Sequence, residues 1–267
     1  MNTLQINSIN EVINELDKII SECEKDNNPL GYFAALYQKV TMKVKEGIES
    51  NIFDDGPRLE KLDVIFAKRY IDAYYAWQKR EKVTKSWQKA FEISNNYWPI
   101  VLQHLLVGMN AHINLDLGIA TAEVSKNKNI DDLKNDFNRI NEILSSLVND
   151  VQNNLAEIWP TLKKILQKTN KTDDFLVDFS MKLARDGAWK FAKTMSATPE
   201  NGIDKLLGER DIKVAEKAGL ITSPGFVPNL IFKIIRMGEK GTVAEWIFRS
   251  KLTPLIRSIN LPVFAKN

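Results

Sequence analysis

Apolar residues recur along most of the chain with the three- and four-residue spacing of one helix face. Ser8 stands where an N-cap residue belongs, ahead of the first such stripe: Ile9, Val12, Ile13, Leu16, Ile19 and Ile20. The same spacing predicts further helices over residues 32–48, 58–82, 86–93, 99–125, 131–155 and 175–195. It places Phe137 and Ile140 on the inward face of the helix over residues 131–155, and Leu183 on the stripe of the helix over residues 175–195. The pattern therefore predicts a protein built mainly from amphipathic helices.

Short polar stretches with glycine or proline separate the predicted helices. Residues 51–57 predict a loop, and Pro99 suits the first turn of the helix that follows it. Only 12 glycines and 9 prolines occur in 267 residues, which argues against an all-β architecture with its many tight turns. We expect an all-α fold with residues 1–267 in a single-domain helical bundle. Within it, residues 202–267 form a less regular helical C-terminal portion of shorter helices that pack on or extend the bundle.

One mostly apolar stretch, residues 103–118, contains both histidines of the chain. Five of its polar residues form an island that we call the polar island: His104, Asn110, His112, Asn114 and Asp116. In an apolar helix these groups are expected to be buried, and buried polar groups need partners. The polar island is therefore the first place to look for a functional site.

Helix geometry decides which members of the polar island can act together. His112 and Asp116 lie four residues apart and share a face, and Asn110 and Asn114 form a second such pair. His104 and His112 are separated by roughly 12 Å of rise and about 80° of rotation. They cannot hold the same small metal ion in a straight helix, although a kink near Gly108 would bring them closer.

Three interpretations of the polar island remain open. A divalent metal would take His112 and Asp116 as ligands, with further ligands from other helices: Asp63, Asp72, Glu142 or Asp186. Against it, the chain has no HExxH and no ExxH motif. A metal-free site would use His112 as general acid and base, oriented by Asp116, with His104 as a further catalytic candidate. In the third interpretation the island is a structural network that ties helices together.

A second group of polar residues marks the predicted helix 58–82. Asp63, Arg69 and Asp72 interrupt a mostly apolar segment, and Arg69 and Asp72 have the spacing of a local ion pair. Arg69 could bind a carboxylate or phosphate in a bidentate manner. With Asn110 and Asn114, these three residues complete our candidate ligand-binding set.

The charge and the cysteine content limit which classes of function the protein can have. The net charge of +3 and pI of about 8.7 are too small to imply a nucleic-acid partner. Residues 203–267 carry 11 Lys and Arg against 6 Asp and Glu, a net charge of +5, whereas the first 202 residues carry 26 against 28, a net charge of −2. Cys23 is the only cysteine and has acidic neighbours, so we expect an inert thiol.

The basic C-terminal part also contains many apolar residues. Residues 226–264 combine both kinds, a pattern that fits contact with an anionic membrane surface or, alternatively, helices packed on the core. The N-terminus has neither the basic nor the apolar region of a signal peptide. No run of about 20 apolar residues occurs, and we expect a cytoplasmic location.

The polar island also carries a resemblance. Residues 103–118, QHLLVGMNAHINLDLG, preceded by LDVIFAKRYIDA at residues 62–73, resemble the domain-of-unknown-function family 5995. The resemblance implies a helical fold and singles out the polar island, but it brings no activity. We therefore expect a helical protein with a buried His/Asn/Asp pocket that acts on or binds a small, largely apolar molecule, with a divalent metal as an option. The alternative is a non-catalytic interaction or membrane-surface protein in which the island is structural.

Overall fold

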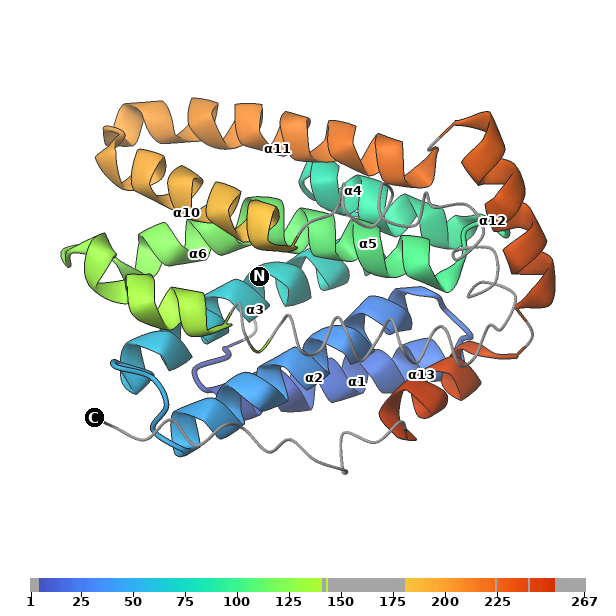
Figure 1. Cartoon of the computed structure of the whole chain (residues 1–267), viewed down its shortest axis with the longest axis horizontal. Helices are drawn as coiled ribbons and strands as arrows, with labels where there is room; N and C mark the ends of the chain where they lie inside the picture. The colour runs from blue at the N-terminus through green and yellow to red at the C-terminus, as the bar shows by residue number, and fades with distance from the viewer. Residues whose placement is uncertain (1–4, 141–142, 144–180, 224, 240, 253–267) are drawn as a thin grey trace.

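The computed structural model describes residues 5–140, 143, 181–223, 225–239 and 241–252 (Figure 1). Every regular element in this part of the chain is a helix, which confirms the all-α fold. None of the described helices is long and apolar enough to cross a membrane.

Three long helices open the chain. They are α1 (Ile9–Lys25), α2 (Leu30–Glu49) and α3 (Gly56–Gln78), and each packs against the other two. The predicted stripe of α1 is buried at Ile9, Val12, Leu16, Ile19 and Ile20. Burial of this one face, rather than intrinsic propensity, supplies most of the stability of such a helix.

Side-chain caps set where α1 and α3 begin. The hydroxyl of Ser8 accepts a hydrogen bond from the backbone N–H of Glu11 at 3.3 Å, as expected from the sequence. The carboxylate of Asp55 accepts one from the N–H of Arg58 at 3.0 Å, and Pro57 lies in the first turn. Helix α3 therefore begins inside the stretch that the sequence assigned to a loop, because proline is preorganised for a first turn.

The helix predicted from Pro99 to residue 125 is present as a central rod of three parts. It follows α4 (Lys85–Glu92) and the short 3₁₀ turn η1 (Ile93–Asn95). The rod consists of α5 (Val101–Ala111), the π-helical turn η2 (His112–Asp116) and α6 (Leu117–Val124). Helices α2, α3, α4, α10 and α11 contact it, so nearly all of its residues are buried.

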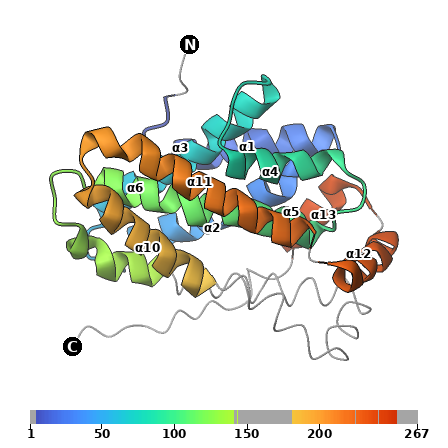
Figure 2. The same ribbon diagram turned by 90° about the horizontal axis from the view of Figure 1, so that it is seen from above.

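The described part of the C-terminal half covers one further side of this rod (Figures 1 and 2). The 3₁₀ turn η3 (Ile130–Leu133) precedes α10 (Met181–Ala197), α11 (Glu200–Thr222), α12 (Phe226–Gly238) and α13 (Val243–Leu252). Helices α10 and α11 lie over α5 and α6, while α13 packs on α1 and α2.

Two expectations for this half need correction. Helix α11 is 23 residues long, not one of several short helices. Its interior glycines each reduce stability by roughly 1 kcal/mol, but the buried stripe Val214, Ala218 and Ile221 compensates by packing on α4 and α5. Leu183, assigned to the inner stripe of its helix, is 69% exposed because Ala184, Ala188 and Trp189 fill that role.

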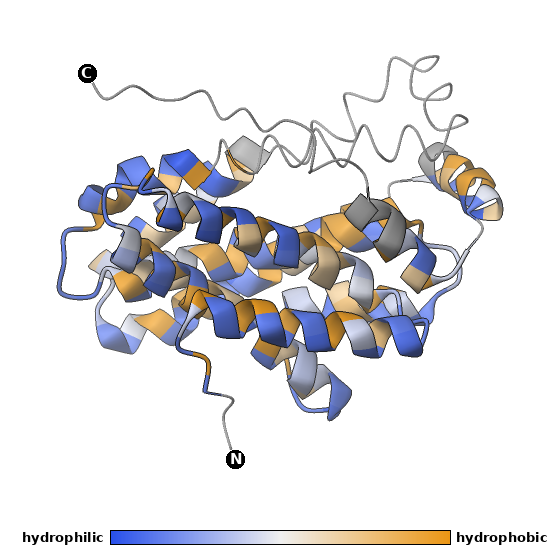
Figure 3. Ribbon diagram, turned by 90° about the horizontal axis from the view of Figure 1, so that it is seen from below, coloured by the Kyte–Doolittle hydropathy of each residue, from blue (hydrophilic) through white to orange (hydrophobic). Residues whose placement is uncertain are grey.

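The other predictions for this half are confirmed only where the chain is described. Residues 134–140 are helical, and Phe137 and Ile140 are buried as expected. The rest of the helix predicted to reach residue 155, and the start of the one predicted from residue 175, lie outside the described residues. Hydropathy follows the packing: polar residues cover most outer surfaces, and α12 stands out as an apolar helix at one end (Figure 3).

Candidate functional site

The centre of the polar island is not α-helical. Over His112–Asp116 the rod forms a single π turn, in which the N–H of Leu117 donates to the carbonyl of His112, five residues earlier. All five residues of the turn are buried. Single π turns inside α-helices are rare and are frequent at functional sites. The turn therefore distinguishes this region from the α-helical segments on either side.

Asp116 is the best-connected residue of the polar island. Its Oδ1 accepts from Arg69 Nε on α3 at 2.7 Å, and its Oδ2 accepts from Trp87 Nε1 on α4 at 2.8 Å. Burial raises the pKa of this fully buried carboxyl. The charge of Arg69 and the hydrogen bonds from His112 and Arg69 outweigh burial, so the pKa lies below its ordinary value. Asp116 is therefore ionised at neutral pH.

The ionised carboxylate fixes the tautomer of His112. His112 Nδ1 lies 3.4 Å from Asp116 Oδ2. Burial lowers the pKa of His112 more than Asp116 raises it, so the ring is neutral. Since a carboxylate only accepts hydrogen bonds, the single ring proton belongs on Nδ1. Nε2 then carries the lone pair, and this buried atom has no hydrogen-bond partner.

Aromatic rings enclose His112. Phe66 stacks on it with ring centroids 3.6 Å apart and planes 9° apart, and Tyr37 meets it edge-on at 4.4 Å. Three more rings have centroids 5.7 to 6.1 Å from the centroid of the His112 ring: Phe33, Trp87 and Tyr70. The unused Nε2 of His112 therefore belongs to a ring held among aromatic side chains from α2, α3 and α4.

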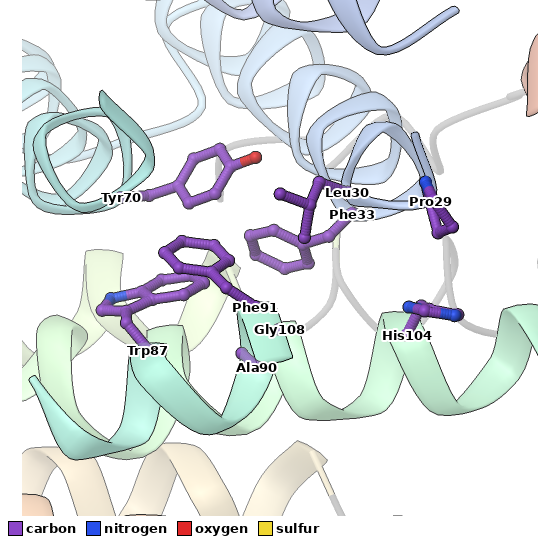
Figure 4. Close-up of a pocket in the computed structure, with 9 residues that line it drawn as sticks. All are labelled: Pro29, Leu30, Phe33, Tyr70, Trp87, Ala90, Phe91, His104 and Gly108. Carbon is purple, nitrogen blue, oxygen red and sulfur yellow. The ribbon is translucent and has the colours of Figure 1, made fainter. Parts of the chain in front are cut away.

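A small cavity lies beside this aromatic group. It measures about 10 Å³, room for about one water molecule. Nine residues of α2 to α5 line it: Pro29, Leu30, Phe33, Tyr70, Trp87, Ala90, Phe91, His104 and Gly108 (Figure 4). Figure 4 shows the Phe33 ring between the Tyr70–Trp87 pair and His104. Phe33, Tyr70 and Trp87 belong both to the lining of the cavity and to the rings around His112.

Gly108 allows Phe33 to approach the rod. A Cβ atom on Gly108 would lie 2.5 Å from two atoms of the Phe33 ring, well inside normal contact. Gly108 lies within α5, and the helix departs from α geometry only four residues later. The structure thus gives Gly108 a packing role beside the cavity, not the role of a kink.

His104 belongs to the cavity and not to the His112–Asp116 pair. Its ring packs edge-on against Tyr32 at 5.8 Å, and its Nδ1 is buried without a hydrogen-bond partner. Burial, and less so the charge of Arg236, lowers its pKa to about 3. The two histidines are thus both neutral but have different surroundings.

Asp63 is a second buried acid near the aromatic group. It is 7% exposed, its Oδ2 has no hydrogen-bond partner, and burial together with Glu60 raises its pKa to about 7. The hydroxyls of Tyr37 and Tyr70 are buried and unpartnered as well. Unpartnered buried polar atoms are uncommon in proteins, and four of them belong to the aromatic group and its α3 neighbour: Tyr37 Oη, Asp63 Oδ2, Tyr70 Oη and His112 Nε2.

The predicted local pair on α3 is wrong. Arg69 binds Asp116, whereas Asp72 is paired with Lys68 at 2.6 Å, and the Asp72 side chain is 50% exposed. The buried carboxylate is the stronger partner for Arg69, because Asp72 is solvated and gains little from an ion pair. The structure therefore does not bring Asp72 together with Asp116, and a ligand-binding role for Asp72 stays a prediction.

The asparagines of the polar island face a different neighbour, α11. Asn110 Nδ2 donates to the carbonyl of Val214 at 2.8 Å, and Asn114 Nδ2 donates to Asn110 Oδ1 at 3.1 Å. Arg210 Nε donates to the carbonyl of Asn114, inside the π turn, at 2.7 Å. Asn110 and Asn114 thus tie α11 to the rod and are not brought together with His112 and Asp116.

The described residues offer no ligand set for the predicted metal. They contain no group of three or more His, Cys, Asp and Glu side chains that could hold an ion. Both oxygens of Asp116 already accept from protein donors. Glu142 lies outside the described residues, and metal binding stays a prediction.

The sequence interpretation missed the residues that give His112 its surroundings. The pattern around the polar island does not single out Trp87, yet its indole N–H donates to Asp116. The thiol of Cys23 fits its expected inertness: it is buried, and burial raises its pKa to about 11. A buried tryptophan requires a hydrogen-bond acceptor, which was the one signal that pointed from Trp87 to the polar island.

The geometry can be set beside known proteins. The model of a family of unknown function, DUF5995, matches residues 9–224. The chain belongs to this family. The match extends from the start of α1 to just beyond α11 and so includes the described parts of the candidate site. No curated protein and no solved structure shows significant similarity to the chain.

Proposed function

We propose that this member of the DUF5995 family binds a small, largely apolar molecule that carries a hydrogen-bond donor, and that His112 Nε2 accepts that hydrogen bond. The observation that carries the proposal is the buried Nε2 lone pair. Its ring is held by Asp116 on one side and by Phe66 stacking on one face. A histidine oriented through Nδ1 by a carboxylate is also the arrangement of a general base, so proton transfer from the bound molecule would use the same atom.

The chemistry of the surroundings supports an apolar ligand. Five aromatic rings lie near His112, and the adjoining cavity has mostly apolar walls. Binding pockets of this kind combine an apolar lining with a few polar groups that fix orientation. Among the residues that line the cavity, His104 and Tyr70 carry buried polar atoms without hydrogen-bond partners, Nδ1 and Oη.

The proposal requires Phe33 to move. The cavity of about 10 Å³ is too small for an organic molecule, and the Phe33 ring both lines it and packs edge-on against His112. Phe33 packs on the bare backbone of Gly108, and we infer that rotation of its side chain enlarges the cavity toward His112.

A comparison of phenol with benzene tests the proposal, because the two probes differ by one hydroxyl donor. We expect phenol to raise the melting temperature of the protein more than benzene does at the same concentration. In His112→Asn the amide nitrogen can replace the Nδ1 donor toward Asp116, but nothing replaces Nε2. This variant should lose the preference for phenol, whereas His112→Gln, whose amide reaches toward the Nε2 position, should retain part of it.

Two results would contradict the proposal. One is the absence of any stabilisation by either probe in the wild-type protein and in Phe33→Ala, which opens the path to His112. The other is an equal preference for phenol in the wild type and in His112→Asn. Either result would favour the alternative in which the polar island is a structural network. Catalysis and a cytoplasmic location stay predictions.

A further inference from the structure

Helix α12 carries an apolar face that points away from the protein. We call Phe226, Leu230, Ile234 and Met237 the outer face of α12; these side chains are 85%, 51%, 46% and 62% exposed. Their spacing of four, four and three residues places them on one side of the helix. The opposite side packs on α5 and α13 through Ile235, which is 5% exposed, together with Ile231 and Phe232.

Two exposed aromatic residues extend this face. Tyr97 and Trp98, in the segment before α5, are 63% and 48% exposed. Lys233 lies 5.2 Å from the Trp98 ring, and Arg236 lies 4.8 Å from the Tyr97 ring and donates to the Tyr97 carbonyl at 2.6 Å. These contacts make the aromatic pair continuous with α12. Figure 3 shows α12 at one end of the molecule.

The charges on α12 have one sign. Lys233 and Arg236 are its only charged residues, and both are cations. Lys233 occupies the middle of the outer face, where its long stem can lie along the apolar side chains while the ammonium group reaches past them. Arg236 is partly balanced by Glu239, at 2.9 Å. Residues 203–267, which include α12 and these two cations, carry a net charge of +5.

We propose that the outer face of α12, with Tyr97 and Trp98, docks the protein onto an anionic membrane surface. An exposed apolar stripe, interfacial aromatic residues and cations within the stripe are the three features of helices that lie in a lipid interface. A second copy of the chain fits the surface less well, because a symmetric contact would bring the Lys233 residues of both copies together. This role is independent of the site around His112.

Vesicle flotation of the full chain tests the proposal. We expect the protein to float with vesicles of phosphatidylcholine and phosphatidylserine, to stay unbound with phosphatidylcholine alone, and to be released by salt. The double variant Leu230→Glu/Met237→Glu should bind the anionic vesicles about tenfold more weakly or worse, since it removes two apolar contacts and adds two repulsive charges.

Met42→Glu is the matched control. Met42 on α2 is also an exposed methionine, at 45%, but it lies on a different helix from the outer face. Circular dichroism of each variant checks that the fold is intact. The proposal is overturned if the wild type does not bind anionic vesicles, or if Met42→Glu and Met237→Glu weaken binding equally. It is also overturned if sedimentation shows a dimer that Met237→Glu disrupts, because the face would then belong to a second copy.

Discussion

The two sides of the polar island differ in how many of their buried polar atoms have a hydrogen-bond partner. On the α11 side, Asn110 and Asn114 bond to each other and to backbone, and Arg210 adds a further bond. On the side of α2, α3 and α4, Asp116 is fully bonded, but His112 Nε2 and the two neighbouring tyrosine hydroxyls are not. One side thus has the features of a structural network, while the other retains unused hydrogen-bonding capacity.

The difference shows why a polar residue in a core is weak evidence for function by itself. Completed hydrogen bonds are sufficient to explain why Asn110 is tolerated inside the protein. An unpartnered buried atom is different, because it leaves a desolvation penalty of about 1–3 kcal/mol uncompensated. A ligand that pairs with such an atom would remove that penalty. The variants below test this distinction.

Removal of Arg69 should have the largest effect on stability. Arg69→Met leaves the fully buried carboxylate of Asp116 without its cationic partner, which should lower the free energy of unfolding by about 3–5 kcal/mol. Arg210→Met is the matched change on the α11 side, where the partner is only a neutral carbonyl, and should lower it by about 1–2 kcal/mol. Urea unfolding at neutral pH measures both. Equal losses would remove the electrostatic distinction between the two sides.

The pH dependence of stability should separate the buried acid from the buried histidine. Asp63 has a pKa raised to about 7 in the folded protein. Its contribution to the free energy of unfolding is therefore present near pH 4 and is lost as pH rises toward 7. His104 has a pKa lowered to about 3, so its contribution is present above about pH 6.5 and is lost as pH falls. Between these limits the two effects oppose each other.

Single variants separate the two opposing changes of unfolding free energy with pH. Relative to wild type, Asp63→Asn should gain about 1.4 kcal/mol of unfolding free energy per pH unit as pH rises from about 4.5 to 6. Relative to wild type, His104→Gln should gain a similar amount of unfolding free energy per pH unit as pH falls through the same range. Urea unfolding across this range measures both, and differences that do not change with pH would mean that neither group is buried in its neutral form.

Much of this architecture is readable from the sequence. The stripe of α1, its cap at Ser8 and the position of the polar island all follow from local spacing, because helix faces repeat every three to four residues. The partners of Asp116 do not follow, because Arg69 and Trp87 lie 47 and 29 residues away and meet it only after the helices pack. The local rule instead assigned Arg69 to Asp72. It does place Asn110 and His112 on different faces of the helix, but it does not say which helices those faces meet.

The packing of Phe33 on Gly108 gives a smaller, steric test. Gly108→Ala places a methyl group 2.5 Å from the Phe33 ring, and the overpacking should lower the free energy of unfolding by about 1–3 kcal/mol despite the better helix propensity of alanine. Gly208→Ala in α11 is the control, because nothing lies within 4 Å of the added Cβ, and it should raise stability by about 0.5–1 kcal/mol. If both substitutions stabilise the protein, Phe33 is free to leave Gly108 without penalty.

Asn114→Ala should give the smallest change and the clearest comparison with His112. It removes the bond from Asn114 Nδ2 to Asn110 Oδ1, a loss of about 1 kcal/mol that the higher helix propensity of alanine offsets by roughly 0.5 kcal/mol. The backbone carbonyl of Asn114, which accepts from Arg210, is unchanged. On this side of the polar island the asparagine side chains already have protein hydrogen-bond partners, so no ligand is needed there. Asn114→Ala should therefore keep the preference for phenol over benzene that His112→Asn loses. If Asn114→Ala loses that preference as well, the two sides act as one unit and the separation between a structural side and a binding side is wrong.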